Sequence, residues 1–304
     1  MDEPKGGMMR KISFLVILFC LPVFALMCAD VIAVMSSRDA DDLIPVDIVF
    51  NAQMDIHELE SAVQGLSRSE KRVTVARLLE EFSREHQYEV LGYLHEMEQQ
   101  GKVQHVRTFW INNAIYCEAT IDVIQALDVH EDIYYVDYDL KHMELEKPQH
   151  QAAVPDRTRE IAWGVLKVRA DQVWPLGYTG DGIVVGVIDT GVNYNHVDLA
   201  SHMWEDPNYP NHGWNFEYNT DDPMDILGHG THCAGSVASD GTAGSQCGVA
   251  PEAQIMALRV RTQADTLAEN QIWAAMEFVV SPPLSPANGG DLISMSLGYW
   301  YTWN

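Results

Sequence analysis

The sequence predicts an α/β fold, a parallel sheet flanked by helices, preceded by a smaller ferredoxin-like α+β domain. The parallel sheet is indicated by residues 183–189, an almost unbroken and mostly β-branched apolar run that ends in a carboxylate, as strands buried on both faces do. The smaller domain is indicated by a strand, helix, strand, strand, helix, strand order between residues 44 and 138. The 304 residues leave room for about two domains.

The N-terminal segment places three basic residues ahead of an apolar run at residues 12–29. This order is typical of a secretory signal, and Val31-Ile32-Ala33 offers a small-residue cleavage site. We therefore expect residues 1–33 to be a signal peptide and the protein to be secreted, to the extracellular medium or the cell envelope. An uncleaved anchor is the alternative, because the run approaches the ~18 residues of a spanning helix. We expect the protein to contact the membrane only through the signal segment, residues 1–33.

Residues 42–142 are expected to form the smaller domain. Strands are predicted at residues 44–50, 105–110, 114–119 and 133–138, with two helices in 55–101 and one in 121–127. Residues 143–158 contain two prolines and no periodicity, which predicts an exposed linker.

Residues 159–304 are expected to form the larger domain. Buried strands are predicted at 183–189, 254–260 and 291–298, a helix at 268–280, and a polar, proline-containing surface loop at 208–225.

Asp189 and His229 are the residues that indicate chemistry. Asp189 stands at the end of the first buried strand, and ligands of open α/β sheets bind beyond such strand ends. His229 follows Gly228 and precedes small residues that suit a closely packed helix. A histidine that accepts the proton of a serine, and a carboxylate that orients the histidine, are two of the three groups of a serine triad.

Two other chemistries fit parts of the same pattern. Asp189-Thr190-Gly191 is also the mark of aspartic peptidases, but the sequence holds no second copy, so that interpretation requires a symmetric dimer. His229, His232 and Cys233 offer metal-ligand types at helical spacing, and a zinc site would need Asp189 or another distant ligand as well.

The segments Val-Ile-Asp-Thr-Gly at 187–191 and Gly-His-Gly-Thr-His-Cys-Ala-Gly at 228–235 resemble the Asp and His motifs of the subtilase family of serine peptidases. The order Asp before His is also that of subtilisin. The resemblance implies that Asp189 orients His229, and that His229 is general base and acid in the hydrolysis of peptide bonds in protein or peptide substrates.

Other segments extend the resemblance. Ser296, Leu297 and Gly298 resemble the family segment that pairs with a bound peptide. Asp198 matches a carboxylate that binds structural calcium (Ca²⁺) in many subtilases, although residues 240–245 lack the asparagine usual in the partner loop.

The smaller domain resembles the propeptide of subtilases, in particular of bacillopeptidase F-type enzymes, over residues 88–116. The resemblance implies an intramolecular inhibitor that blocks the substrate cleft until the linker is cut, with the maturation cleavage between residues 142 and 154. An unrelated small domain is the alternative.

The sequence contains no Gly-Thr-Ser-Met-Ala-like motif and no candidate for the asparagine that donates to the oxyanion. We therefore expect an amino-terminal fragment of a longer precursor that is inactive on its own, with the serine and the asparagine beyond Asn304. The rival hypothesis is a non-catalytic binding or chaperone-like protein that keeps the fold and lacks the nucleophile.

The net charge limits the possible binding partners, and the cysteine content bears on disulfide bonding. A formal net charge of -25 argues against nucleic acid and anionic membranes, because both would repel the protein. Five cysteines are too few and too scattered for a disulfide framework. Cys233, one helical turn after His229, is expected to be a small buried hydrophobic residue.

Overall fold

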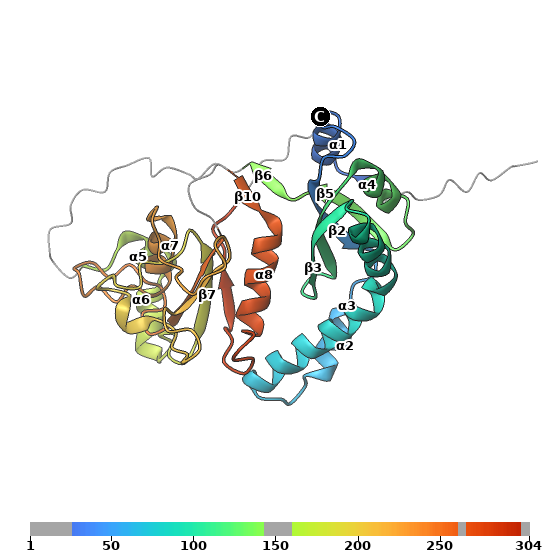
Figure 1. Cartoon of the computed structure of the whole chain (residues 1–304). Coiled ribbons are helices and arrows are strands. Elements are labelled where there is room, and N and C mark those ends of the chain that lie inside the picture. Colours follow the sequence, from blue (N-terminus) through green and yellow to red (C-terminus); the bar gives the residue numbers. More distant parts are fainter. Residues whose placement is uncertain (1–25, 143–159, 261–265, 299–304) are drawn as a thin grey trace, which may run out of the picture.

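The computed structural model describes residues 26–142, 160–260 and 266–298. They form a small domain and a larger α/β part, with helix α8 (Glu269–Val280) between the two (Figure 1). The expected maturation site in the linker and most of the expected signal peptide lie outside the described residues. No helix in the described ranges combines the length and the apolar character that a membrane span requires.

The small domain is a five-stranded sheet in the order β1-β5-β2-β4-β3, with β2 antiparallel to both β4 and β5. Helices α3 and α4 cover one face of it. In chain order its elements are β1 (Leu26–Met27), α1 (Ala29–Met35), β2 (Ile44–Phe50), α2 (Ile56–Ala62), α3 (Arg68–Gln99), β3 (Val103–Phe109), β4 (Ala114–Ala119), α4 (Ile121–Asp128), β5 (Ile133–Tyr138) and β6 (Leu140–His142).

The two faces of strand β2 have different neighbours. Ile44, Val46 and Ile48 are buried in a core with residues of α3 and α4. Val49 points the other way, into a cluster with Phe109 and residues of α8. This alternation follows from the two-residue period of a strand. It makes one face of the sheet the surface that contacts the larger part.

Helix α1 occupies the segment where the end of the signal peptide was expected. Its Val31 is fully buried in the core of the small domain, and the Cys28 backbone N–H donates to the Val136 carbonyl at 3.1 Å. Residues 26–35 therefore pack onto the domain that was expected to begin at residue 42.

The larger part is built on a parallel sheet in the order β11-β7-β9-β8. Helix α7 packs on one face and α8 on the other, so that every residue of β7 is buried. Besides α8, the elements of this part are, in chain order, α5 (Trp163–Val168), α6 (Ala170–Val173), η1 (Trp174–Leu176), β7 (Val184–Asp189), η2 (Ala200–His202), β8 (Gly213–Asn215), α7 (His229–Ala238), β9 (Gln254–Arg259), β10 (Thr266–Ala268) and β11 (Leu292–Ser294).

Two segments of this part differ from the expectation. Residues 208–225 are more than a surface loop, because they contain β8, and Tyr209 is 3% exposed in the core beside Trp204. The aromatic side chains of this insertion supply the apolar area that anchors it. The strand expected at residues 291–298 is limited to β11, which in the described residues pairs only with β7.

The small domain contacts α8 along its length. β6 pairs antiparallel with β10, just before the helix. Near the middle, the rings of Phe109 and Trp273 meet edge to face at 5.3 Å. Beyond the helix, Arg72 Nη1 donates to Asp291 Oδ1 at 2.8 Å. The first turns of α3 therefore reach the loop that leads into β11 (Figure 1).

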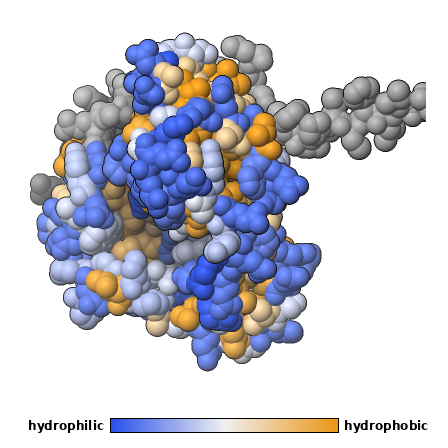
Figure 2. Space-filling view, turned by 45° about the vertical axis from the view of Figure 1, so that its right-hand side comes forward, coloured by the Kyte–Doolittle hydropathy of each residue, from blue (hydrophilic) through white to orange (hydrophobic). Residues whose placement is uncertain are grey.

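Hydrophilic side chains dominate the face of the molecule seen in Figure 2, with smaller hydrophobic patches between them. This surface agrees with the high net charge, which favours solubility.

Candidate active site

Asp189 and His229 are brought together by two backbone elements that meet at their ends. Asp189 is the last residue of β7, and His229 is the first residue of α7. Gly230 is needed at this junction, because a Cβ added to it would lie 2.1 Å from the Gly191 carbonyl oxygen. The helix can therefore approach the strand end only with glycine at this position.

The Asp189 and His229 side chains share a short hydrogen bond, with 2.7 Å between His229 Nδ1 and Asp189 Oδ1. The Asp189 side chain is 1% exposed and that of His229 is 23% exposed. The Thr190 backbone N–H also donates to Asp189 Oδ1, at 2.7 Å. A carboxylate on Nδ1 sets the tautomer of a neutral imidazole, so His229 Nε2 is the nitrogen that can exchange protons with a reactant.

Asp225 stabilises the junction between the two elements, although neither sequence motif includes it. Its Oδ1 accepts from Thr190 Oγ1 at 3.0 Å, and its Oδ2 accepts from the Thr231 backbone N–H at 2.8 Å. Burial alone would raise the pKa of Asp225, but hydrogen bonds from Thr231, Gly228 and Leu227 outweigh it and hold that pKa below its usual value. An aspartate shortly before a helix start is the signal that points to such a cap.

Cys233 lies beside the histidine, with its Sγ 3.8 Å from His229 Nδ1. Burial raises the pKa of the Cys233 thiol, while a hydrogen bond with Ser296 acts in the opposite direction. The thiol is therefore a neutral neighbour of the pair. The effect of Ser296 on the pKa of Cys233 indicates that this expected substrate-binding residue lies close to the His229 helix.

The structure brings together only part of the ligand set expected for zinc. Asp189, His229 and Cys233 each offer a ligand atom within 4.8 Å of the others, and the other such group in the described residues is Glu89, His130 and Asp132. His232 belongs to neither group and is exposed. The His229–His232 pair on which this alternative was based is therefore not assembled.

The other expected substrate residues follow β11 outside the strand. Leu297 is half-buried against the core under α8, while Ser296 and Gly298 are exposed. Strand β10, which pairs with β6, was not predicted from the sequence. It has only three residues, of which Leu267 and Ala268 are apolar, so it gives little local signal.

Asp198, the expected calcium ligand, lies apart from these residues. It is 6% exposed, and its Oδ2 accepts from Ser239 Oγ at 3.2 Å while its Oδ1 accepts from the Ala243 backbone N–H. Calcium requires about six to eight oxygen ligands, and both oxygens of Asp198 already accept protein donors. Asp198 belongs to neither group of adjacent ligand residues in the described ranges. In the described residues Asp198 therefore ties the 240–245 loop to the domain, and its role as a calcium ligand stays a prediction.

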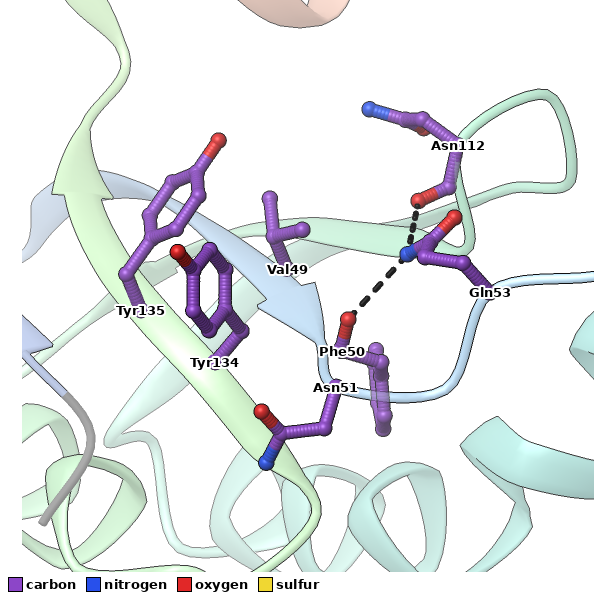
Figure 3. A pocket seen from close by; sticks show the side chains of 7 residues that line it. All are labelled: Val49, Phe50, Asn51, Gln53, Asn112, Tyr134 and Tyr135. Atoms are coloured by element: carbon purple, nitrogen blue, oxygen red, sulfur yellow. Dashed lines mark hydrogen bonds between the residues drawn. The ribbon is translucent and has the colours of Figure 1, made fainter. Parts of the chain in front are cut away.

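A pocket of about 420 Å³ lies in the small domain, away from the Asp189–His229 pair (Figure 3). Gln53 closes one side, donating from Nε2 to the Phe50 and Asn112 carbonyl oxygens at 3.1 and 3.0 Å. The lining holds amides, tyrosines and apolar groups but no carboxylate, histidine or cysteine, so it offers neither a nucleophile nor a general base near neutral pH. Its lining residues are Val49, Phe50, Asn51, Gln53, Asn112, Tyr134 and Tyr135.

Comparison with known proteins gives a consistent result. A sequence model of the subtilase family matches residues 180–302. Bacillopeptidase F of Bacillus subtilis (strain 168) is 29% identical over 238 residues, which are 72% of this chain and 16% of that protein. Thermitase of Thermoactinomyces vulgaris is 34% identical over 137 residues, 45% of this chain and 44% of thermitase. The chain thus spans less than half the length of either relative.

Among solved structures, fervidolysin from Fervidobacterium pennivorans, a keratinolytic enzyme related to subtilisin, is similar to this chain with a TM-score of 0.50. The similarity covers 92% of this chain and 38% of fervidolysin, at 19% sequence identity. This likeness concerns the fold, and it confirms the predicted α/β, subtilisin-like architecture.

Proposed function

The chain belongs to the subtilase family, which residues 180–302 match, and on this premise we propose that it is the amino-terminal part of a secreted serine endopeptidase precursor. The whole protein hydrolyses peptide bonds in proteins or peptides through an Asp–His–Ser triad. Asp189 and His229 are the first two members. The serine and the asparagine that donates to the oxyanion come from chain beyond Asn304.

The 2.7 Å hydrogen bond between His229 Nδ1 and Asp189 Oδ1 carries this proposal. With Nδ1 held by the carboxylate, His229 Nε2 accepts the proton of the serine as it attacks the substrate carbonyl, and returns that proton to the leaving amine. The buried Asp189 stabilises the imidazolium that forms in between, because a charge in a less polar environment interacts more strongly with its neighbour. Without a nucleophile the pair forms no acyl-enzyme, so residues 1–304 alone are inactive.

The small domain acts as the propeptide and as an intramolecular inhibitor until the linker at 143–158 is cut. The pairing of β6 with β10 supports this role, with Leu140 opposite Ala268. Extended peptides bind open strands by this kind of strand addition. After the domain leaves, a substrate takes the place of β6 on β10, and residues 296–298 contact its other edge.

A labelling experiment on the full-length gene product, continued past Asn304, tests this function. A serine-directed fluorophosphonate should label the protein after the linker is cut, and Asp189→Asn should lower peptide hydrolysis about 10⁴-fold, because an amide favours the wrong tautomer. His229→Ala should abolish self-cleavage in the linker. His232→Ala is the matched control, because His232 is exposed on the same helix, and it should behave like the wild type.

The same experiment distinguishes the proposed peptidase from the rival hypothesis of a non-catalytic protein. A full-length protein that takes no label after the small domain has been removed, and that hydrolyses no peptide, is a non-catalytic subtilase-fold binding or chaperone-like protein. Loss of activity in His232→Ala equal to that in His229→Ala would also contradict the assignment of His229 as the base.

A further inference from the structure

The contact between the small domain and α8 contains more acidic than basic side chains. Three aspartates come from the small domain, and two glutamates come from the helix. The two basic side chains near them are Lys141 and Arg107. The carboxyl groups are those of Asp47, Asp137, Asp139, Glu269 and Glu277. Ionised carboxylates without matching cations repel one another when they are buried.

Asp47 is the most isolated of these groups. It is fully buried on β2, and no hydrogen-bond donor of the described residues reaches either of its carboxyl oxygens. The Lys141 ammonium donates elsewhere, to Asp137 Oδ2 at 2.6 Å and to the Tyr138 carbonyl at 2.5 Å. A buried carboxylate with no donor is very costly, so Asp47 is held in its neutral form.

Asp139 is the charged neighbour that acts most strongly on Asp47. The Asn270 backbone N–H donates to Asp139 Oδ1 at 2.8 Å, and Asn270 Nδ2 donates to Oδ2 at 2.9 Å. Asp139 thus caps the first turn of α8 as an acceptor on both oxygens. Burial raises the pKa of Asp139 as well, but the bonds from Asn270 oppose that rise. Of the two acids Asp47 therefore carries the proton, because its pKa is raised well above its usual value by burial first, and then by Asp139 and Glu269.

The other charged or titratable groups around Asp47 do not form a hydrogen bond that would stabilise its ionised form. Tyr116 of β4 and Asp137 of β5 lie opposite it in the sheet. Lys141 attracts its charge but forms its hydrogen bonds with other acceptors. The Cys117 thiol is buried, and burial raises its pKa, so it is neutral.

Glu277 forms a second acidic contact, in the last turn of α8. Its Oε1 accepts from the backbone N–H groups of Trp110 at 2.5 Å and Ile111 at 3.2 Å. Both bonds go to one oxygen, which a protonated carboxyl group can also provide. Burial raises the pKa of Glu277 from 4.5 to about 7, in spite of these bonds and of Arg107, and Glu80 adds to the rise.

We propose that the contact between the small domain and α8 is a proton-dependent latch, closed when Asp47 and Glu277 carry protons and loosened when both are ionised. In the detached state both carboxyl groups are solvated and titrate near pH 4 to about 4.5. In the closed state they keep their protons to higher pH. Closure therefore takes up protons, and the closed state loses stability as the pH rises through the interval between the detached and the closed pKa values.

The latch predicts a small domain that is held tightly in mildly acidic medium and released in alkaline medium. For Glu277 the interval runs from 4.5 to about 7, so this group alone should weaken closure roughly 100-fold between pH 4.5 and pH 8. Asp47 should extend the effect to higher pH, because its pKa in the closed state is raised further. The inference rests on the interface and is independent of the proposed peptidase activity.

Neutral isosteres test the latch in the chain of residues 1–304. Asp47→Asn and Glu277→Gln imitate the protonated forms at every pH. Backbone hydrogen exchange of α8 and β10 is compared between each variant and the wild type at the same pH, so that the intrinsic exchange rates cancel. We expect similar protection at pH 5.5, and protection at pH 8.5 that is up to about 100-fold greater in Glu277→Gln than in the wild type. Glu81→Gln is the matched control, because Glu81 is an exposed carboxylate that pairs with Arg77 on α3.

Two outcomes would overturn the latch. One is equal protection of the wild type and Glu277→Gln at pH 8.5, and the other is weaker protection in Glu277→Gln, which would mean that the ionised carboxylate holds Trp110 and Ile111 better. If Asp47→Asn does not fold, Glu277→Gln still decides the question. Since no serine takes part in the measurement, its failure leaves the proposed function untouched.

Discussion

Gly230→Ala should separate the two members of the candidate active site. A Cβ at this position would lie 2.1 Å from the Gly191 carbonyl oxygen and 3.1 Å from Asp189 Oδ1. Carbon and oxygen atoms approach to about 3.3 Å, so α7 must move by about 1 Å away from the end of β7. The 2.7 Å bond between His229 Nδ1 and Asp189 Oδ1 then exceeds the ~3.2 Å limit of a good hydrogen bond. We expect a loss of about 1–3 kcal/mol in the free energy of unfolding.

The assay combines urea unfolding of residues 1–304 with peptide hydrolysis by the full-length protein. A displacement of about 1 Å in a catalytic group should lower hydrolysis about 100-fold. Gly235→Ala is the control, because on the same helix its Cβ would meet only Ser239 Cβ, at 3.9 Å. The control should gain up to about 1 kcal/mol of stability from helix propensity. A Gly230→Ala protein as stable and as active as Gly235→Ala would refute the argument that the close contact positions the pair.

Three further substitutions test the junction at the candidate active site and the contact between the small domain and the larger part. Asp225→Ala should lower the free energy of unfolding by about 1–2 kcal/mol at pH 7 and by little at pH 2. The pKa of Asp225 is lowered in the folded state by hydrogen bonds that outweigh its burial, so its contribution is present above about pH 4 and lost below it; urea unfolding with equal losses at both pH values would contradict this. Arg72→Ala should lower the free energy of unfolding by about 1.5–3 kcal/mol, because Asp291, whose side chain is 11% exposed, then keeps only Arg68 as a cation. Arg77→Ala, at an exposed pair, should change the same measurement by less than about 0.5 kcal/mol. Trp273→Ala should cost about 3–5 kcal/mol and expose α8 to hydrogen exchange, and unchanged protection would exclude Trp273 as an anchor of the small domain.

The fold class and many of its elements follow from local patterns in the sequence. The β-branched run that ends at Asp189 predicts a strand buried on both faces, and β7 is such a strand. The alternation of apolar and polar residues in 105–110 and 114–119 predicts a pair of strands, and β3 and β4 form an antiparallel pair. These predictions succeed because the spacing of apolar residues directly reflects which faces are buried.

The less predictable elements lack such local signals. Strand β8 has three residues inside a polar, proline-containing insertion, and only its pairing with β9 makes it a strand. Asp198 belongs to a segment that resembles a calcium loop, but the donors of Ser239 and Ala243 occupy its oxygens. A ligand shell depends on residues far apart in the chain, so one matching carboxylate does not predict it.

The sequence by itself determined the identity of Asp189 and His229 as a pair, because each lies in a short motif whose neighbours specify a strand end and a helix start. Only the tertiary structure decided the roles of Asp225 and Asp47. Asp225 acts across the loop between β7 and α7, and Asp47 looks in the sequence like an ordinary polar residue of an alternating strand. Its burial arises when the sheet of the small domain packs on α8, and no local pattern encodes which surface will cover the polar face of a strand.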